Sequence, residues 1–142
     1  MTSFTEKYTE VGQRLLDRFL AGSPDFVAAL ISTIDGRLML ERSRREIGGT
    51  RVASMSSSLI ALSEALGGEL SMKPCSHVTV STEAGVIVLL RIGGPGSVLT
   101  LTTVARQGVN LGTLLASSRR AANELNDVNS EFAIDLSASA ET

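Results

Sequence analysis

The stretch FVAALISTIDGRLMLER, residues 26–42, decides the fold of this 142-residue chain. Residues 26–34 are almost uninterruptedly apolar, which is typical of a strand buried on both faces. The dipeptide Asp35-Gly36 follows, and it supplies the positive backbone angles that a two-residue hairpin turn requires. Residues 37–42 then alternate as a half-exposed strand does. The stretch therefore predicts an antiparallel hairpin with a central first strand and a second strand nearer a sheet edge.

Three more strands are predicted downstream, over residues 75–81, 86–92 and 98–105. The connections between them are short, so neighbouring strands must run antiparallel. Residues 86–90 are apolar on both faces and should be interior, whereas residues 75–81 carry polar groups on one side and are expected at an edge. That edge contains no proline or lysine, which leaves it open to pairing with another chain.

Amphipathic helices are predicted before the hairpin and after the last strand. The first should end near Ala21, because Gly22 and Pro24 cannot continue it. Asn110 should cap the last helix, which is expected to end near Asn126. The length is typical of a single domain, which we assign to residues 1–127. Residues 128–142 are small and polar, and we expect a frayed or disordered tail there.

A middle helix is predicted to begin at Thr50 and to end at Gly67-Gly68. Its apolar stripe is expected to face the sheet and consists of Val52, Met55, Leu59, Leu62 and Leu66. Its other face is made of small residues, namely Ala53, Ser54, Ser56, Ser57, Ser58, Ala61 and Ser63. Such a face is either a helix contact in a dimer or a plain solvent-exposed surface.

A dimer interface is predicted to use both this small-residue face and the open edge strand. The predicted interface residues are Ser54, Ser57, Ser58, Ala61, Cys75, His77 and Thr79.

Catalytic chemistry is not indicated by any motif in the sequence. The glycine-rich stretch GGPGS, residues 93–97, lacks the Gly-Lys-Ser/Thr ending of a phosphate loop and joins two strands, so we interpret it as a hairpin loop. Cys75 and His77 are two residues apart on one strand and would share a face. A zinc site or an activated thiolate would need further groups that the sequence does not supply nearby. We therefore predict no catalytic, cofactor-binding or metal-binding residues, and no enzyme.

Composition and charge argue against two classes of partner. The chain is 43% hydrophobic and 20% charged with a net charge of −2, which offers no attraction to nucleic acid or anionic lipid. Its longest apolar runs fall far short of the ~20 residues of a membrane-spanning helix. The sole cysteine and the polar N-terminal segment indicate a reducing compartment. We expect a cytoplasmic protein without nucleic-acid binding or membrane insertion.

Four segments together resemble the bacterial branch of the roadblock (dynein light-chain roadblock) family. They are ALISTIDGRLMLERS at 29–43, RVASMSSSLIALSEALGGEL at 51–70, VTVSTEAGVIVLLRIG at 78–93 and VNLGTLLASSRRAANEL at 109–125. The resemblance covers nearly the whole chain. It implies an α/β (α+β), roadblock/profilin-like fold with a five-stranded antiparallel sheet. The middle helix would lie on one face of the sheet and the first and last helices on the other.

The same resemblance implies a function. Family members form homodimers that join edge strands across a two-fold axis, and they act as non-catalytic regulators or adaptors of small Ras-like GTPases in signalling. A basic group would then contact the partner, and we assign this role to Arg44, Arg45 and Arg51, although such a run is usually a solvated loop.

Two alternatives remain open at this point. One is a structural scaffold subunit of a larger assembly that binds its neighbours irrespective of nucleotide. The other is a hydrolase or ligand-binding domain on a profilin-like sheet, which would need a deep pocket with convergent polar groups.

Overall fold

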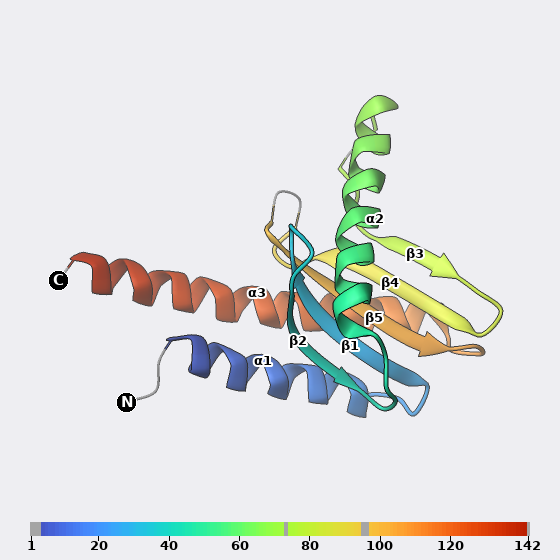
Figure 1. The fold of residues 1–142 in the computed structure, drawn as a ribbon, viewed down its shortest axis with the longest axis horizontal. Coiled ribbons are helices and arrows are strands. Elements are labelled where there is room, and N and C mark those ends of the chain that lie inside the picture. Colours follow the sequence, from blue (N-terminus) through green and yellow to red (C-terminus); the bar gives the residue numbers. More distant parts are fainter. Residues whose placement is uncertain (1–3, 73, 95–96, 142) are drawn as a thin grey trace.

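The computed structural model describes the backbone of residues 4–72, 74–94 and 97–141, and most side chains up to residue 130. Within these ranges it contains one antiparallel sheet with the strand order β2-β1-β5-β4-β3 (Figure 1). The elements are α1 Phe4–Ala21, β1 Phe26–Thr33, β2 Leu38–Ser43, α2 Gly49–Glu69, β3 Val78–Ser81, β4 Gly85–Arg91, β5 Leu99–Arg106 and α3 Leu111–Glu141. Helices α1 and α3 cover one face of the sheet and α2 crosses the other (Figure 1). The predicted fold class and element order are confirmed.

The sheet places its strands largely where the apolar patterns predict. β1 is interior between β2 and β5, β4 is interior between β5 and β3, and β3 is an edge. β3 begins only at Val78, later than predicted, because the residues before it bond locally. The Cys75 thiol donates to the His77 carbonyl oxygen over 3.3 Å, and Ser76 Oγ lies 3.1 Å from His77 Nδ1. These contacts take the place of a regular strand ladder.

The turn between β1 and β2 differs from the two-residue turn predicted at Asp35-Gly36. Thr33 N donates to the Arg37 carbonyl oxygen over 2.9 Å, and Gly36 N donates to the Thr33 carbonyl oxygen over 3.0 Å. Three residues, 34–36, therefore lie between the bonded residues Thr33 and Arg37, and among them only Gly36 has a positive φ, at 89°. This is the geometry of a tight turn followed by one left-handed glycine.

The main hydrophobic core lies between the sheet and the α1/α3 layer. Phe19 of α1 stacks on Phe26 of β1 with ring centroids 4.6 Å apart. The fully buried residues around this contact include Leu16, Ile31, Val88, Leu101, Leu114 and Leu125. As predicted, α1 ends at Ala21. No helix in the described part of the chain is long and apolar enough to cross a membrane.

Helix α3 continues to Glu141, so the predicted end near Asn126 is wrong. Val128 packs against the core one turn after Leu125 and prolongs the buried stripe. The sequence after Gly112 also contains no glycine or proline that would stop a helix. The structure thus gives helix in most of residues 128–142, where we expected a frayed or disordered tail. The assignment of residues 1–127 to a single domain stays a prediction.

Helix α2 is turned about its axis relative to the prediction. Its buried residues are four of the small ones and one isoleucine, namely Gly49, Ala53, Ser56, Ser57 and Ile60. Met55 is 62% exposed, Leu62 67% and Leu66 62%, whereas Ile60 is 2% exposed. The prediction that the stripe of large apolar residues faces the sheet is therefore wrong.

The sheet face beneath α2 explains this orientation. The buried residues of β1 and β5 that alternate with the α1/α3 core include Ser32, Thr100 and Thr102. Small side chains on α2 let the helix lie close to this partly polar surface. The helix also lies close to the turn between β1 and β2, since a Cβ atom on Gly36 would lie 3.1 Å from the Ser54 Cα atom.

The start of α2 also differs from the prediction. The N-cap is Gly48, without a side-chain capping bond, and the helix begins at Gly49 instead of being capped by Thr50. A Cβ atom at residue 49 would meet the carboxylate of Glu41, so a larger residue there would require the Glu41 side chain to move. At the other end Gly67-Gly68 does not stop the helix, which runs to Glu69.

Candidate interaction surface

The outward face of α2 is an apolar surface that we call the leucine stripe, formed by Met55, Leu59, Leu62 and Leu66. All four side chains are exposed. Leu70 and Met72 continue the exposed apolar surface just beyond the helix. The C-terminal turns of α2 extend past the sheet, so the end of the stripe stands clear of the body of the protomer (Figure 1). Contiguous exposed apolar surface of this kind marks an interaction site.

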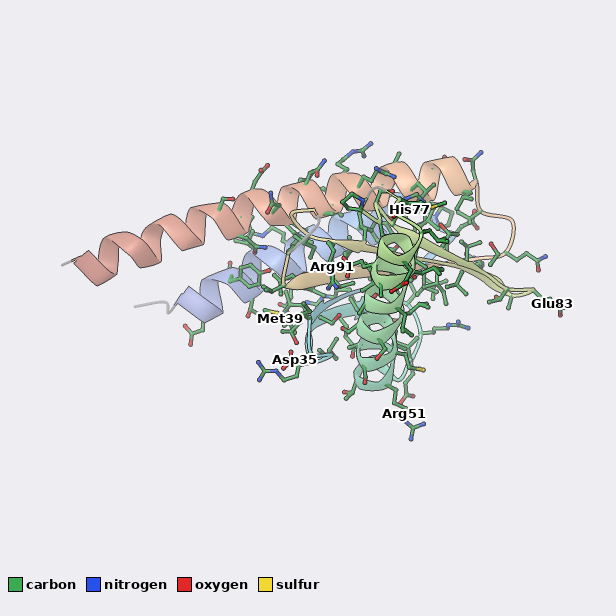
Figure 2. All side chains as sticks on the ribbon, turned by 90° about the horizontal axis from the view of Figure 1, so that it is seen from above. Asp35, Met39, Arg51, His77, Glu83 and Arg91 are labelled. Atoms are coloured by element: carbon green, nitrogen blue, oxygen red, sulfur yellow. The ribbon has the colours of Figure 1, made fainter. Side chains whose placement is uncertain are left out.

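Two polar contacts fix α2 on the sheet. Ser57 Oγ donates to the Thr33 carbonyl oxygen over 2.8 Å. Farther along the helix, Arg91 Nη2 lies 2.7 Å from Glu64 Oε1 and Arg91 Nε lies 3.2 Å from Glu64 Oε2. Arg91 Nη1 also donates to Thr100 Oγ1 over 2.9 Å. Figure 2 shows Arg91 among the side chains between the sheet and α2. These contacts hold the helix with the leucine stripe turned outward.

An apolar groove of about 330 Å³ lies beside α2, over the half of the sheet that the helix leaves open. Val52, Met55 and Leu59 of α2 form one wall. The floor is formed by the strand residues Val80, Ile87, Leu89 and Val104. Since Val80 belongs to β3, the groove connects the leucine stripe to the edge of the sheet. The stripe, the groove and the β3 edge therefore make one continuous surface.

The edge strand β3 pairs with β4 on one side, and no strand of the described chain pairs with its other side. Next to it, Arg119 of α3 donates from Nη2 to His77 Nδ1 over 3.0 Å. Burial and, secondarily, the positive charge of Arg119 lower the pKa of His77 below its ordinary value. The imidazole is therefore neutral at pH 7, and an accepting Nδ1 leaves its proton on Nε2.

The predicted dimer-interface residues lie in three different environments. Ser57 is buried beneath α2, where no second chain can reach it. Ser54, Ser58 and Ala61 are exposed on the flanks of the helix. Cys75, His77 and Thr79 are half-buried at the sheet edge. Sequence reasoning missed the leucine stripe because it predicted that the large apolar residues of α2 face the sheet. The alternating serine and threonine residues of β1 and β5 are the signal that could have revealed the orientation.

The predicted partner-binding arginines also differ in what their side chains contact. Arg44 donates from Nε to the Phe26 carbonyl oxygen over 2.7 Å and from Nη2 to the carbonyl oxygens of Leu20 and Ser23. It therefore holds the connection between α1 and β1 in place. Arg45 and Arg51 are exposed, and Figure 2 shows Arg51 projecting from the beginning of α2.

In the described part of the chain, no group of three or more histidine, cysteine, aspartate or glutamate side chains is placed to hold an ion. Cys75 precedes β3 and its thiol bonds to the His77 backbone. Pro95 and Gly96 of the glycine-rich stretch lie outside the described residues, but the stretch joins β4 to β5, as a hairpin loop does.

Several solved structures are similar to this fold. A structure of MglB with a tetrameric arrangement matches 88% of this chain and 92% of its own, with a TM-score of 0.78 and 18% identity. MglB of Myxococcus xanthus matches 85% and 96%, with a TM-score of 0.76 and 15% identity. A roadblock/LC7 domain from Streptomyces avermitilis matches 81% and 94%, with a TM-score of 0.73 and 15% identity.

The sequence itself matches no protein-family model and no curated protein. The structural likeness therefore establishes the fold, and this chain has the roadblock fold. The fold resemblance inferred from its sequence is confirmed.

Proposed function

We propose that this chain is a non-catalytic regulator that associates with a second copy of itself and binds a small Ras-like GTPase. The observation that supports self-association is the continuous surface made by the leucine stripe, the apolar groove and the open β3 edge. Left in water, such a surface forgoes roughly 25 cal/mol for each Å² of apolar area that a partner could bury. An uncovered edge strand is also a template for pairing with another chain.

A two-fold arrangement would satisfy both features at once. Pairing β3 with its counterpart would prolong the sheet, and the two leucine stripes would then meet over the joint. The comparison structure of MglB, which has the same fold, is described as tetrameric, which is consistent with self-association of the fold. In this arrangement the interface includes Met55, Leu59, Leu62 and Leu66 in addition to the exposed residues of the predicted set.

Light scattering at micromolar concentration tests the first half of the proposal. The unaltered protein should show twice the chain mass, and Leu62→Lys should reduce it to the mass of one chain because the charge would be buried at the interface. Leu111→Lys is the matched control, since Leu111 is an exposed leucine at the start of α3 on the other side of the sheet. A single-chain mass for the unaltered protein would contradict self-association.

The GTPase partner is proposed from the roadblock resemblance together with the surface that a dimer would offer. Two α2 helices side by side would form a broad platform, with Arg45 and Arg51 of each chain at its rim. Contacts to switch regions that the γ-phosphate orders would favour the GTP-bound form. Arg44 contributes indirectly, because its guanidinium is engaged by backbone carbonyl groups.

Titration of the dimer against the Ras-like GTPases of its organism, loaded with GDP or with a non-hydrolysable GTP analogue, tests the second half. We expect tighter binding of the GTP form. Arg51→Glu should slow association and weaken its salt dependence, while Arg120→Glu on α3 should leave both unchanged. Equal affinity for the two nucleotide forms would favour the alternative, a structural scaffold subunit.

A further inference from the structure

A second concave site lies at the end of the sheet where β1 begins and β5 ends. It is a cleft of about 390 Å³ between the loop after β2 and the turn from β3 to β4. We call it the arginine cleft, after Arg44, Arg45 and Arg106 in its lining. None of the surfaces in the proposed function uses Arg106.

The charge of the cleft is of one sign. Its lining contains three arginines and no aspartate or glutamate. Asp25 lies nearby and is paired with Arg106, with 3.5 Å between Arg106 Nε and Asp25 Oδ1. Glu83 stands at the tip of the turn from β3 to β4 and points away from the sheet (Figure 2). Within the lining no carboxylate faces the three guanidinium groups. Just outside it, Asp25 pairs with Arg106, and Glu41 and Glu46 line a neighbouring pocket together with Arg45.

Two of the guanidinium groups are held in place by the backbone. Arg44 donates to carbonyl oxygens that include those of Phe26 and Ser23, and Arg106 donates to that of Pro24. Carbonyl groups orient an arginine without neutralising its charge. No hydrogen bond from the Nη1 atom of either arginine occurs within the described part of the chain, so donors remain for a ligand. Arg45 is exposed at the mouth of the cleft.

The floor of the cleft is apolar. Val27, Ile87 and Val104 line it. Val27 lies where the register between β1 and β5 shifts, between Phe26 and Ala28. Ile87, Val104 and Arg45 also line the apolar groove beside α2, so the two depressions adjoin. A ligand that fits this site has carboxylates for the rim and an apolar group for the floor.

We propose that the arginine cleft binds an acidic peptide segment of a partner protein. The carboxylates of the segment pair with Arg45 and Arg106, and an adjacent apolar side chain covers Val27, Ile87 and Val104. Carboxylates suit this rim because guanidinium groups bind them in a planar, two-point geometry. A bare phosphate group would leave the apolar floor in contact with water.

Fluorescence anisotropy with the intact protein tests this site without any GTPase. The probe is a labelled peptide of alternating glutamate and leucine residues, measured at low salt. We expect binding that weakens as salt is added and that falls about tenfold or more in Arg106→Gln and in Arg45→Glu, which corresponds to about 1.4 kcal/mol. Arg120→Glu is the control, and it should bind the peptide as the unaltered protein does.

Four further measurements decide the outcome. A peptide of glutamate and serine should bind more weakly, since it cannot cover the floor, and a peptide of lysine and leucine should not bind. Circular dichroism of each variant should match that of the unaltered protein. Absence of binding by the glutamate and leucine peptide would overturn the proposal. Competition by pyrophosphate at lower concentrations than the peptide would also overturn it, and would assign the cleft to a phosphate ligand.

Discussion

Arg91 of β4 and Glu64 of α2 form a two-point ion pair across the layer between helix and sheet, with the closer contact at 2.7 Å. The Arg91 side chain is only 5% exposed. Because the helix face toward the sheet is otherwise made mainly of small residues, the pair is a main determinant of where the second half of α2 lies. It therefore also sets the direction in which the leucine stripe points.

Replacing Glu64 by glutamine should destabilise the fold. The substitution leaves the buried Arg91 without its counter-charge, and we expect a loss of about 2 to 3 kcal/mol in the free energy of unfolding, because Glu64 itself is partly exposed. Urea denaturation measures the change. Glu10→Gln is the matched control, since it breaks the exposed Glu10–Arg14 pair and should cost less than about 0.5 kcal/mol. Equal effects of the two substitutions would contradict the role given to Arg91 and Glu64.

Replacing two neighbouring serines of α2 by arginine should change the melting temperature to very different extents. Ser57 is buried and bonded to the Thr33 carbonyl oxygen, so Ser57→Arg should lower the melting temperature strongly or prevent folding. Ser58 is exposed and belongs to the proposed interface, so Ser58→Arg should weaken self-association but lower the melting temperature much less than Ser57→Arg does. Thermal denaturation followed by circular dichroism compares the two variants. Similar melting temperatures would show that α2 does not have the orientation described.

The sole histidine should make stability fall at mildly acidic pH. The pKa of His77 is lowered in the folded protein by burial and by Arg119, so the unfolded chain takes up the proton first as pH falls. Stability should be complete above the ordinary pKa and should decline below about pH 6.5 toward the folded pKa. Denaturation at a series of pH values measures this decline. His77→Gln should flatten it, and an unchanged slope would contradict the lowered pKa.

The sole tyrosine should have the corresponding effect at alkaline pH. Burial raises the pKa of Tyr8 to about 12 from an ordinary value near 10. The folded state therefore retains the phenol proton where the unfolded chain has lost it, so stability is complete below about pH 10 and is lost as pH rises toward 12. Absorbance of tyrosinate gives the pKa directly. Tyr8→Phe should reduce the alkaline loss of stability, and a tyrosinate transition near pH 10 in the folded protein would contradict the burial.

The sheet could be predicted from the sequence because apolar alternation reports how deeply each strand is buried. The continuous run in β1 and the mixed pattern before and within β3 gave their interior and edge positions correctly. The orientation of α2 could not be obtained in this way. A stripe of leucines looks the same whether it covers the protein's own sheet or is available to a second chain, and the serines of the opposite face were taken for surface.

Other features depend on contacts between distant parts of the chain. Arg44 and Arg106 line the same cleft because β2 and β5 both pair with β1, and no local sequence pattern connects these two residues. The continuation of α3 is a different case, since the missing helix stop after Gly112 was visible in the sequence. There the small, polar composition was given more weight than the absence of helix breakers.

The outward leucine stripe has a consequence for the turnover of the protein in a cell. If the proposed self-association holds, a newly made protomer exposes this apolar helix until it binds a second copy, and the fraction of exposed helices then depends on the protein concentration. At low abundance, solitary copies would expose this helix to chaperones and proteases, whereas at high abundance they would be shielded from them. The amount of protein synthesised could thereby set its own rate of turnover, without a dedicated degradation signal.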